Sequence, residues 1–190
     1  MKTDLKNQAD YKLSKIGRIP MEWKLVSLES VSDKIMVGIA SSATHAYRES
    51  GVPLFRNQNI KESGLDDSDL LFIEEGYETS HRNKRLKSGD VLTVRTGYPG
   101  ISAVVPKKYE GAQCFTSLIT RPNKDLISSE WLALYINSPI GKKLIQGAEA
   151  GGAQKNVNAG VLSKLLIPTI PLPEQRKIAQ ILSTWDEAIE

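Results

Sequence analysis

The hydrophobic period of this sequence changes near Asn123, and this change constrains the fold more than any other feature. Before it, apolar residues come in short runs between turn signals, as at 91–94 and 101–105, and a further strand is expected at 114–120. After it, "SSEWLALYIN" places apolar residues at helical spacing behind two serines, either of which suits an N-cap. Strands that precede helices favour an α+β fold, with a β-rich body and C-terminal helices, over a doubly wound parallel sheet.

The last predicted helix follows a proline-rich entry in "IPLPEQRKIAQILSTWDEAIE", residues 170–190. Pro173 suits the first helical position, where a missing N–H costs nothing, and Glu174 complements the positive end of the helix dipole. Apolar residues then recur at spacings of four, three and four, at Ile178, Leu182, Trp185 and Ile189. This 3.5-residue period is typical of a coiled-coil seam, so we predict a partner helix for these four residues.

The length of 190 residues fits one substantial core with an appendage rather than two full domains. We divide the chain into a flexible polar segment at 1–15, a globular domain at 16–170 and a terminal helix at 171–190. No apolar run approaches the roughly 18 residues of a membrane span, and the N-terminal segment lacks the apolar core of a signal peptide. We therefore expect a cytoplasmic protein with no membrane partner.

Charge is segregated along the chain, although the net charge is only +3. Seven acids and no Lys or Arg lie from Glu62 to Glu78, whereas the stretch from Tyr77 to Lys108 holds seven bases against two acids. Such segregation predicts a basic face opposite an acidic one, unless both stretches are solvated loops.

Patterns for covalent catalysis are sparse. The single cysteine, Cys114, excludes an internal disulfide and a zinc site built on several thiolates. With His45 or His81 it could form a thiol nucleophile pair, but a lone Cys in an apolar strand is more often a small core residue. No phosphate-binding loop is found, and "GYPG" between two apparent strands indicates a hairpin rather than a nucleotide cradle.

A metal-dependent nuclease stays an alternative because three acids lie close together, at Asp66, Asp67 and Asp69. Phosphodiester cleavage uses metal-held water and charge neutralisation. No Glu-x-Lys strand follows these acids, however, so a solvated turn is the simpler interpretation.

Side chains suited to reading base edges are concentrated in loops. Arg pairs with guanine, and Asn or Gln pairs with adenine. Arg95 and Tyr98 could add a phosphate contact or a stacking plane. The predicted contact set is Arg56, Asn57, Gln58, His81, Arg82, Asn83, Lys84, Arg85, Arg95, Tyr98, Gln154, Lys155 and Asn156. On a chain without a catalytic set, these loops indicate nucleic-acid binding.

Several stretches resemble the specificity subunits of type I restriction-modification systems. They are "IGRIPMEWKLVSLESV", "GVPLFRNQNI", "SGDVLTVRTGYPGISAVVP", "GGAQKNVNAGVLSKLLIPTIPLPEQRKIAQIL" and "STWDEAI". Together they span nearly all the chain from Ile16 onward, in the family's order. The segment from Leu165 to Ile189 is the most specific, because the proline entry, Glu-Gln, Ile-Ala and Trp-Asp follow each other as in those proteins.

The resemblance implies an α+β target recognition domain with a twisted β-rich body, followed by the start of a conserved spacer helix. Family members commonly carry two such domains, each of which reads one half of a split DNA sequence, and two long antiparallel helices that set the gap. This sequence holds one domain and a barely begun helix. A half-length form, a fragment and an expressed single domain all stay open.

The resemblance also implies that the chain is not an enzyme. Its expected partners are double-stranded DNA, modification subunits that methylate adenine, restriction subunits that translocate DNA, and a second copy through the C-terminal helix. The cofactors S-adenosylmethionine, ATP and magnesium are expected only in partner subunits. The main alternative is a protein-interaction or assembly module that acts chiefly through its C-terminal helix.

Overall fold

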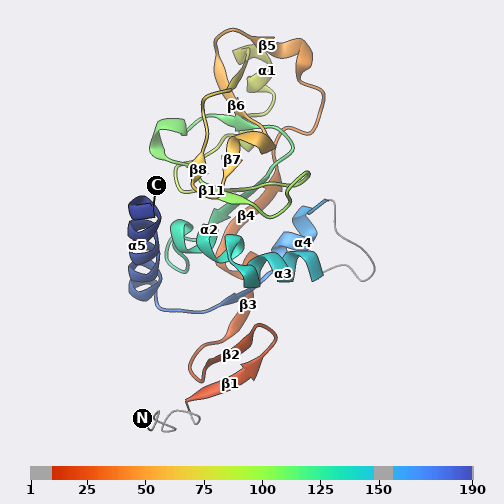
Figure 1. Cartoon of the computed structure of the whole chain (residues 1–190). Coiled ribbons are helices and arrows are strands. Elements are labelled where there is room, and N and C mark those ends of the chain that lie inside the picture. Colours follow the sequence, from red (N-terminus) through yellow and green to blue (C-terminus); the bar gives the residue numbers. More distant parts are fainter. Residues whose placement is uncertain (1–9, 148–155, 190) are drawn as a thin grey trace.

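The computed structural model describes residues 10–147 and 156–189, and for 186–189 only the backbone. These residues form a protruding hairpin, a body of two four-stranded sheets with a layer of helices, and a terminal helix beside that layer (Figure 1). The mixture of strands and helices confirms the predicted α+β class. No helix among these residues has the length and apolar character needed to cross a membrane.

An antiparallel sheet of four strands, in the order β11-β10-β13-β4, forms the centre of the body. Its strands are β4 (Ser32–Val37), β10 (Val91–Thr93), β11 (Ser102–Val104) and β13 (Leu118–Pro122). Successive side chains on a strand point to opposite faces. Val91 and Leu118 accordingly enter one buried cluster, while Leu92 and Ile119 enter another. Both faces of the sheet are therefore covered, and the strands predicted at 91–94 and 101–105 are confirmed.

Helices cover one face of this central sheet. They are α2 (Ser129–Asn137), α3 (Pro139–Gly147) and α4 (Ala159–Ser163). The side chain of Ser128 accepts a hydrogen bond from the backbone N–H of Trp131 at 3.3 Å, which confirms a serine N-cap. Trp131, Leu132 and Ile136 then join the same buried cluster as Val91.

A second sheet of four strands, in the order β12-β6-β9-β5, forms the far part of the body (Figure 1). Its strands are β5 (Tyr47–Arg48), β6 (Val52–Phe55), β9 (Leu71–Ile73) and β12 (Gln113–Cys114), and α1 (Glu75–Thr79) follows β9. The pair β7 (Ile60–Lys61) and β8 (Gly64–Leu65) lies against β11. Short 3-10 helices occupy Leu28–Val31, Thr44–Ala46, Asn57–Asn59, Arg82–Lys84 and Lys107–Tyr109.

The single strand predicted at 114–120 is wrong. Cys114 belongs to the second sheet and Leu118 to the central one, so the chain crosses between sheets at 115–117. Thr116 interrupts the strand because its φ of 59° lies in the left-handed region. This crossing becomes important for the loops described below.

The N-terminal hairpin consists of β1 (Tyr11–Ser14) and β2 (Gly17–Pro20), and it protrudes from the body (Figure 1). The predicted flexible segment at 1–15 is therefore wrong from Tyr11 onward, because Tyr11–Ser14 pairs along its whole length with Gly17–Pro20. Beyond the hairpin, β3 (Leu25–Ser27) pairs with β14 (Leu166–Pro168). This pairing joins the two ends of the body.

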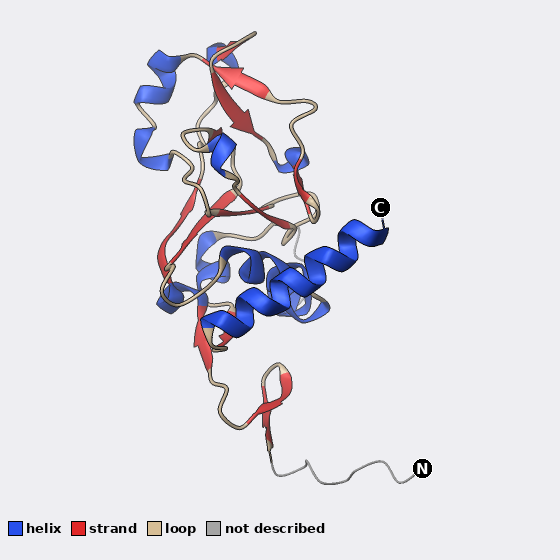
Figure 2. Cartoon of the chain, turned by 90° about the vertical axis from the view of Figure 1, so that its left-hand side faces the viewer, coloured by secondary structure: helices blue, strands red, loops and turns tan. Residues whose placement is uncertain are grey.

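The terminal helix α5 (Leu172–Ile189) lies across the helical layer, with its C-terminal end extending beyond the body (Figure 2). It begins one residue before Pro173, the residue predicted to occupy the first helical position. Gln175 anchors its first turn: the side-chain amide donates to the carbonyls of Leu126 and Ile170 at 3.1 and 2.7 Å, and its oxygen accepts from the N–H of Ser128 at 2.8 Å.

Candidate nucleic-acid interface

Several loops leave the central sheet at one end. Leu118 pairs with both Val37 and Thr93, and Thr93 pairs with Ser102, so these four residues align across the sheet. The chain enters or leaves the sheet there through residues after Val37, through 94–101 and through 115–117. We call this edge of the sheet and its loops the loop end. Two predicted contact residues, Arg95 and Tyr98, lie on it.

Hydrogen bonds bring three of the predicted loops together at the loop end. Asn57 Nδ2 donates to Thr96 Oγ1 at 2.9 Å, and Asn57 Oδ1 accepts from Ser117 Oγ at 2.8 Å. Arg95 Nε donates to Asn156 Oδ1 at 3.0 Å, and the backbones of Thr96 and Asn156 form a β-bridge. The loops at 56–59, 95–98 and 156 therefore form one connected surface. Gln154 and Lys155 lie outside the described residues.

Arg56 and Gln58 share one carboxylate, that of Asp69. Arg56 Nη2 and Gln58 Nε2 each lie 2.8 Å from Asp69 Oδ2, and the side chain of Arg56 is only 26% exposed. A base or phosphate would have to compete with Asp69 for this guanidinium. Asn59, next in the chain, is buried and fixes the turn by accepting the N–H of Arg56 at 2.9 Å.

The loop at 81–85 divides into inward and outward side chains. Arg85 donates from Nε and Nη2 to the buried carboxylate of Glu78, at 2.6 and 2.5 Å. This bidentate contact, with some help from Gln113 and against the opposing effect of burial, lowers the pKa of Glu78. Lys84 Nζ donates to the carbonyl of Gly38 at 2.8 Å. Arg82 and Asn83 are left exposed at the surface.

His81 belongs to an aromatic group at the start of the same loop. Its ring lies 4.6 Å from that of Tyr77, which in turn meets His45 edge-on at 5.1 Å. His81 Nδ1 lies 3.0 Å from the carbonyl of Tyr77, and Ser41 Oγ lies 3.0 Å from the Tyr77 hydroxyl. The sequence pattern does not reveal this group, because Ser41 and His45 lie more than 30 residues before Tyr77.

Gly38 links the 81–85 loop to the loop end. Its carbonyl accepts from Lys84, and its N–H donates to the carbonyl of Ser117 at 2.9 Å. A Cβ on Gly38 would lie 2.3 Å from the carbonyl oxygen of Cys114, so only glycine fits. Cys114 itself is fully buried, and burial raises the pKa of its thiol to about 12. That thiol stays protonated and hidden, which argues against the nucleophile pair with His45 or His81.

The three acids of the nuclease alternative each accept hydrogen bonds from different residues. Asp66 Oδ1 accepts from the N–H and hydroxyl of Ser68, at 3.0 and 2.6 Å. Hydrogen bonds from Tyr109 and then Lys108 lower the pKa of Asp67. Asp69 binds Arg56 and Gln58, as described above. Across residues 10–147 and 156–189, no group of three His, Cys, Asp or Glu residues is placed to hold a metal ion.

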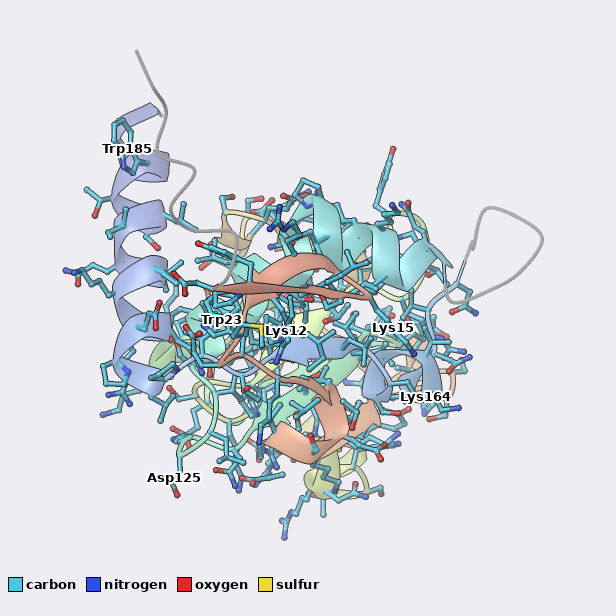
Figure 3. The ribbon with its side chains drawn as sticks, turned by 90° about the horizontal axis from the view of Figure 1, so that it is seen from below. Lys12, Lys15, Trp23, Asp125, Lys164 and Trp185 are labelled. Atoms are coloured by element: carbon cyan, nitrogen blue, oxygen red, sulfur yellow. The ribbon has the colours of Figure 1, made fainter. Side chains whose placement is uncertain are left out.

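The seam predicted on α5 is only partly covered. Ile178 packs against the core, whereas Leu182 is 44% and Trp185 is 64% exposed. The side chain of Ile189 lies outside the described residues. Ile181, also exposed, extends the apolar strip, and Trp185 projects from the outer part of the helix (Figure 3). We call Ile181, Leu182 and Trp185 the outer face of α5.

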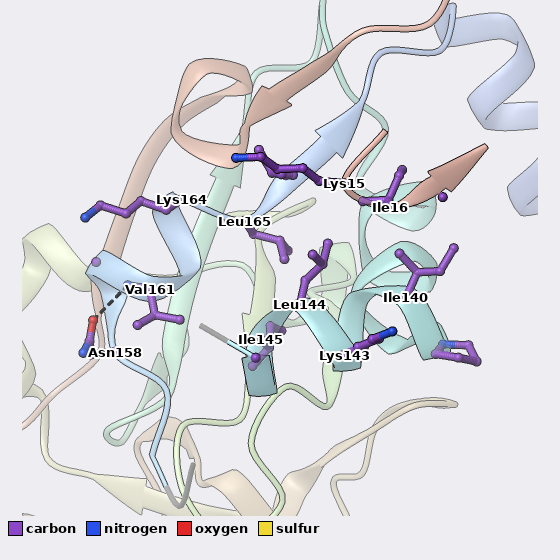
Figure 4. Close-up of a pocket in the computed structure, with 15 residues that line it drawn as sticks. Lys15, Ile16, Ile140, Lys143, Leu144, Ile145, Asn158, Val161, Lys164 and Leu165 are labelled. Carbon is purple, nitrogen blue, oxygen red and sulfur yellow. Dashed lines mark hydrogen bonds between the residues drawn. The ribbon is translucent and has the colours of Figure 1, made fainter. Parts of the chain in front are cut away.

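A cavity of about 1080 Å³ lies between the turn of the N-terminal hairpin, α3 and α4. Leu144 and Leu165 face each other across it, and Lys15, Lys143 and Lys164 stand at its border (Figure 4). Among the residues that the structure describes, no predicted DNA-contact residue lines this cavity. The predicted interface is therefore a set of surface loops and not this cavity.

Comparison with known proteins points to one family. The family model for the type I restriction modification DNA specificity domain matches residues 20–190. A putative type I restriction enzyme MjaX specificity subunit from Methanocaldococcus jannaschii is 31% identical, over 96% of this chain and 44% of its own length. The type I restriction enzyme EcoKI specificity subunit of Escherichia coli K12 is 26% identical, over 88% of this chain and 37% of its own length.

Solved structures share the fold. The crystal structure of the HsdS subunit from Thermoanaerobacter tengcongensis matches 90% of this chain and 44% of its own, with a TM-score of 0.64 and 20% identity. A structure from work on complex assembly and conformational transition of the type I R-M system matches 90% of this chain and 40% of its own. Its TM-score is 0.67, and the sequence identity is 22%. This chain spans less than half the length of each of these relatives. Because the family model covers nearly all of the sequence, the chain belongs to the family of type I restriction-modification DNA specificity domains.

Proposed function

We propose that this chain is a non-catalytic double-stranded DNA recognition domain that reads one half of a bipartite target. The observation that carries the proposal is the convergence at the loop end of three segments that hold predicted contact residues, 56–59, 95–98 and 156, linked through Asn57, Thr96 and Asn156. Membership of the specificity family supports the same function. Loops on a rigid sheet are a common way to present binding residues.

Exposure and internal bonding together separate the predicted residues by role. Arg82, Asn83 and Tyr98 are exposed, and Tyr98, at 80%, stands on a loop whose glycines Gly97 and Gly100 adopt φ of 88° and 98°. These three residues are the best placed to touch DNA directly, Arg82 and Asn83 by hydrogen bonds and Tyr98 by stacking. Lys84 and Arg85 bond to other parts of the protein, although the side chain of Arg85 is 45% exposed, and they hold the loop in shape.

The chemistry of the whole system would lie in partner subunits. We propose that this domain directs modification and restriction subunits to the target, and that S-adenosylmethionine, ATP and magnesium bind in those subunits. The relatives support this division of labour, since they are specificity subunits of type I restriction enzymes.

A selection experiment tests DNA recognition. The 190-residue chain is incubated at moderate salt with a pool of duplexes randomised over the target length, and the bound fraction is sequenced. We expect enrichment of one short asymmetric sequence, because a half-site is not a palindrome. Equal recovery of all sequences would contradict the proposal.

Matched variants locate the interface. The double change Arg82→Ala and Asn83→Ala is expected to lower affinity for the selected duplex about tenfold, the effect of one good base contact. Lys164→Ala, which removes a lysine at the cavity on another part of the body, is the control and should bind as the wild type does. An equal loss in both would indicate general charge attraction.

The exposed outer face of α5 favours a second function, assembly with another helix. Leu182 and Trp185 follow the 3.5-residue period of a helix seam and are largely uncovered. We propose that this face binds a helix of a second copy or of a partner subunit. Sedimentation of the wild type and of Leu182→Asp over a range of concentrations tests self-association. Identical monomeric behaviour of both would rule out the second copy.

A further inference from the structure

Asn57 uses both ends of its side-chain amide inside the protein. Nδ2 donates to the hydroxyl of Thr96, 39 residues away, and Oδ1 accepts from the hydroxyl of Ser117, 60 residues away. A bidentate contact to adenine would require the same two atoms. Each atom keeps one further hydrogen or lone pair, but the two bonds fix the orientation of the amide, so Asn57 is not free to turn toward a base.

The Ser117 side of this connection is rigid and hidden from solvent. Ser117 has no exposed surface, so it cannot touch DNA. Two bonds fix the segment before it: Phe115 N–H donates to the carbonyl of Phe55 at 2.7 Å, and Thr116 N–H donates to that of Ile39 at 2.9 Å. Thr116 is a β-branched residue held at φ 59°, a strained conformation that persists only where its surroundings impose it.

The Thr96 side reaches the exposed loops. Thr96 lies between Arg95 and the loop that carries Tyr98, and its backbone is bridged to Asn156. On the other side, the carbonyl of Ser117 accepts from the N–H of Gly38, whose own carbonyl binds Lys84 of the 81–85 loop. One chain of bonds therefore runs from the fixed crossing between the sheets to each exposed loop.

We infer that Asn57 is a positioning residue that sets the relative placement of the 95–98 and 81–85 loops, so that the base preference of the domain is a joint property of both. The inference rests on the proposed function and deepens it. Asn57 acts through Thr96 and Ser117 and makes no base contact of its own.

The test compares the base-by-base preference profiles of four chains selected from the same randomised duplex pool. Asn57→Ala removes both bonds. Ser117→Ala removes one of them at a residue that DNA cannot reach. Asn57→Asp keeps an acceptor for the hydroxyls of Ser117 and Thr96 but cannot donate to a base. Thermal unfolding, followed by circular dichroism, checks that each variant is folded.

The inference predicts that Asn57→Ala and Ser117→Ala both weaken discrimination about tenfold at several base positions at once. Asn57→Asp should keep the wild-type profile, with a uniformly lower affinity because it adds a negative charge near phosphates. A merely structural contact would lower the melting temperature and leave the profile unchanged.

Three results would overturn the inference. In the first, Asn57→Ala and Asn57→Asp lose preference at one base position while Ser117→Ala keeps it, which would make Asn57 a direct reader. In the second, all variants keep the wild-type profile. In the third, the wild-type chain itself has no sequence preference. This last result overturns the proposed function as well, whereas the first two leave that function intact.

Discussion

The loop end and the outer face of α5 are both exposed, but they differ in what holds them. At the loop end, polar side chains bond to each other, as Asn57 does with Thr96 and Ser117. On the outer face of α5, Leu182 and Trp185 present apolar surface to solvent. The side chains of the first surface are already fixed in position, whereas the second surface leaves apolar area uncovered.

Under the functions proposed above, this difference corresponds to two ways of presenting a binding site. A surface that must discriminate between similar ligands gains from side chains that are fixed beforehand, because less entropy is lost on binding. A surface that only has to join two helices needs apolar area at the correct spacing. The predictions below perturb one surface or the other, in order of expected effect on the free energy of unfolding.

Gly38→Ala should give the largest loss. The added Cβ would meet backbone and sulfur atoms of Cys114 at 2.3 to 2.5 Å, and overpacking of this kind costs about 3 kcal/mol. The control is Gly76→Ala in α1, where nothing lies within 4 Å of the added Cβ, and it should be neutral or stabilising by up to about 1 kcal/mol. Urea unfolding measures both. Equal stability of the two variants would show that the crossing between the sheets is not tightly packed.

Gln175→Ala should destabilise the protein by about 2 kcal/mol. It removes the partner of three buried or half-buried backbone groups, the N–H of Ser128 and the carbonyls of Leu126 and Ile170. Gln180→Ala, an exposed position on the same helix, is the control and should change the free energy of unfolding by less than about 0.5 kcal/mol. A Gln175 variant as stable as the control would mean that α5 is not anchored at its first turn.

Glu78→Gln should lower the stability at neutral pH and make the stability less dependent on acid pH. The folded-state pKa of Glu78 is lowered, so the unfolded state binds more protons, and the stabilisation is present above the pKa of an exposed glutamate, about 4.3. It is lost as the pH falls through the lower folded-state pKa. Below about pH 4.3, the variant should therefore lose stability less steeply than the wild type. Glu75→Gln, exposed on the same helix, should keep the wild-type slope.

Trp185→Ser should have the smallest effect on stability, less than about 0.5 kcal/mol, because 64% of this side chain is already exposed. Any self-association at high concentration should weaken, since the largest apolar group of the outer face is removed. Urea unfolding and light scattering measure the two effects. A large loss of stability would show that the indole packs on the body and is not available to a partner.

Much of the fold could be predicted from local pattern. The Ser128 cap, the strands at 91–94 and 101–105 and the terminal helix all carry a periodic or capping signal within a few residues. The N-terminal hairpin and the crossing at 115–117 could not be predicted. Each strand of the hairpin is only four residues long, which is too short for a clear periodic signal. The crossing depends on which sheet takes each half of one apolar run.

The candidate site was predictable in its residue types but not in its geometry. The sequence by itself determined that Arg, Asn and Gln gather in loops on an α+β body, and that α5 carries a seam with period 3.5. Only the tertiary structure decided that Asn57 and Arg85 bond to other side chains of the protein while Tyr98 stands exposed. The physical reason is that bonds between residues tens of positions apart leave no periodic trace in the sequence, whereas helices, caps and strands are set by neighbours.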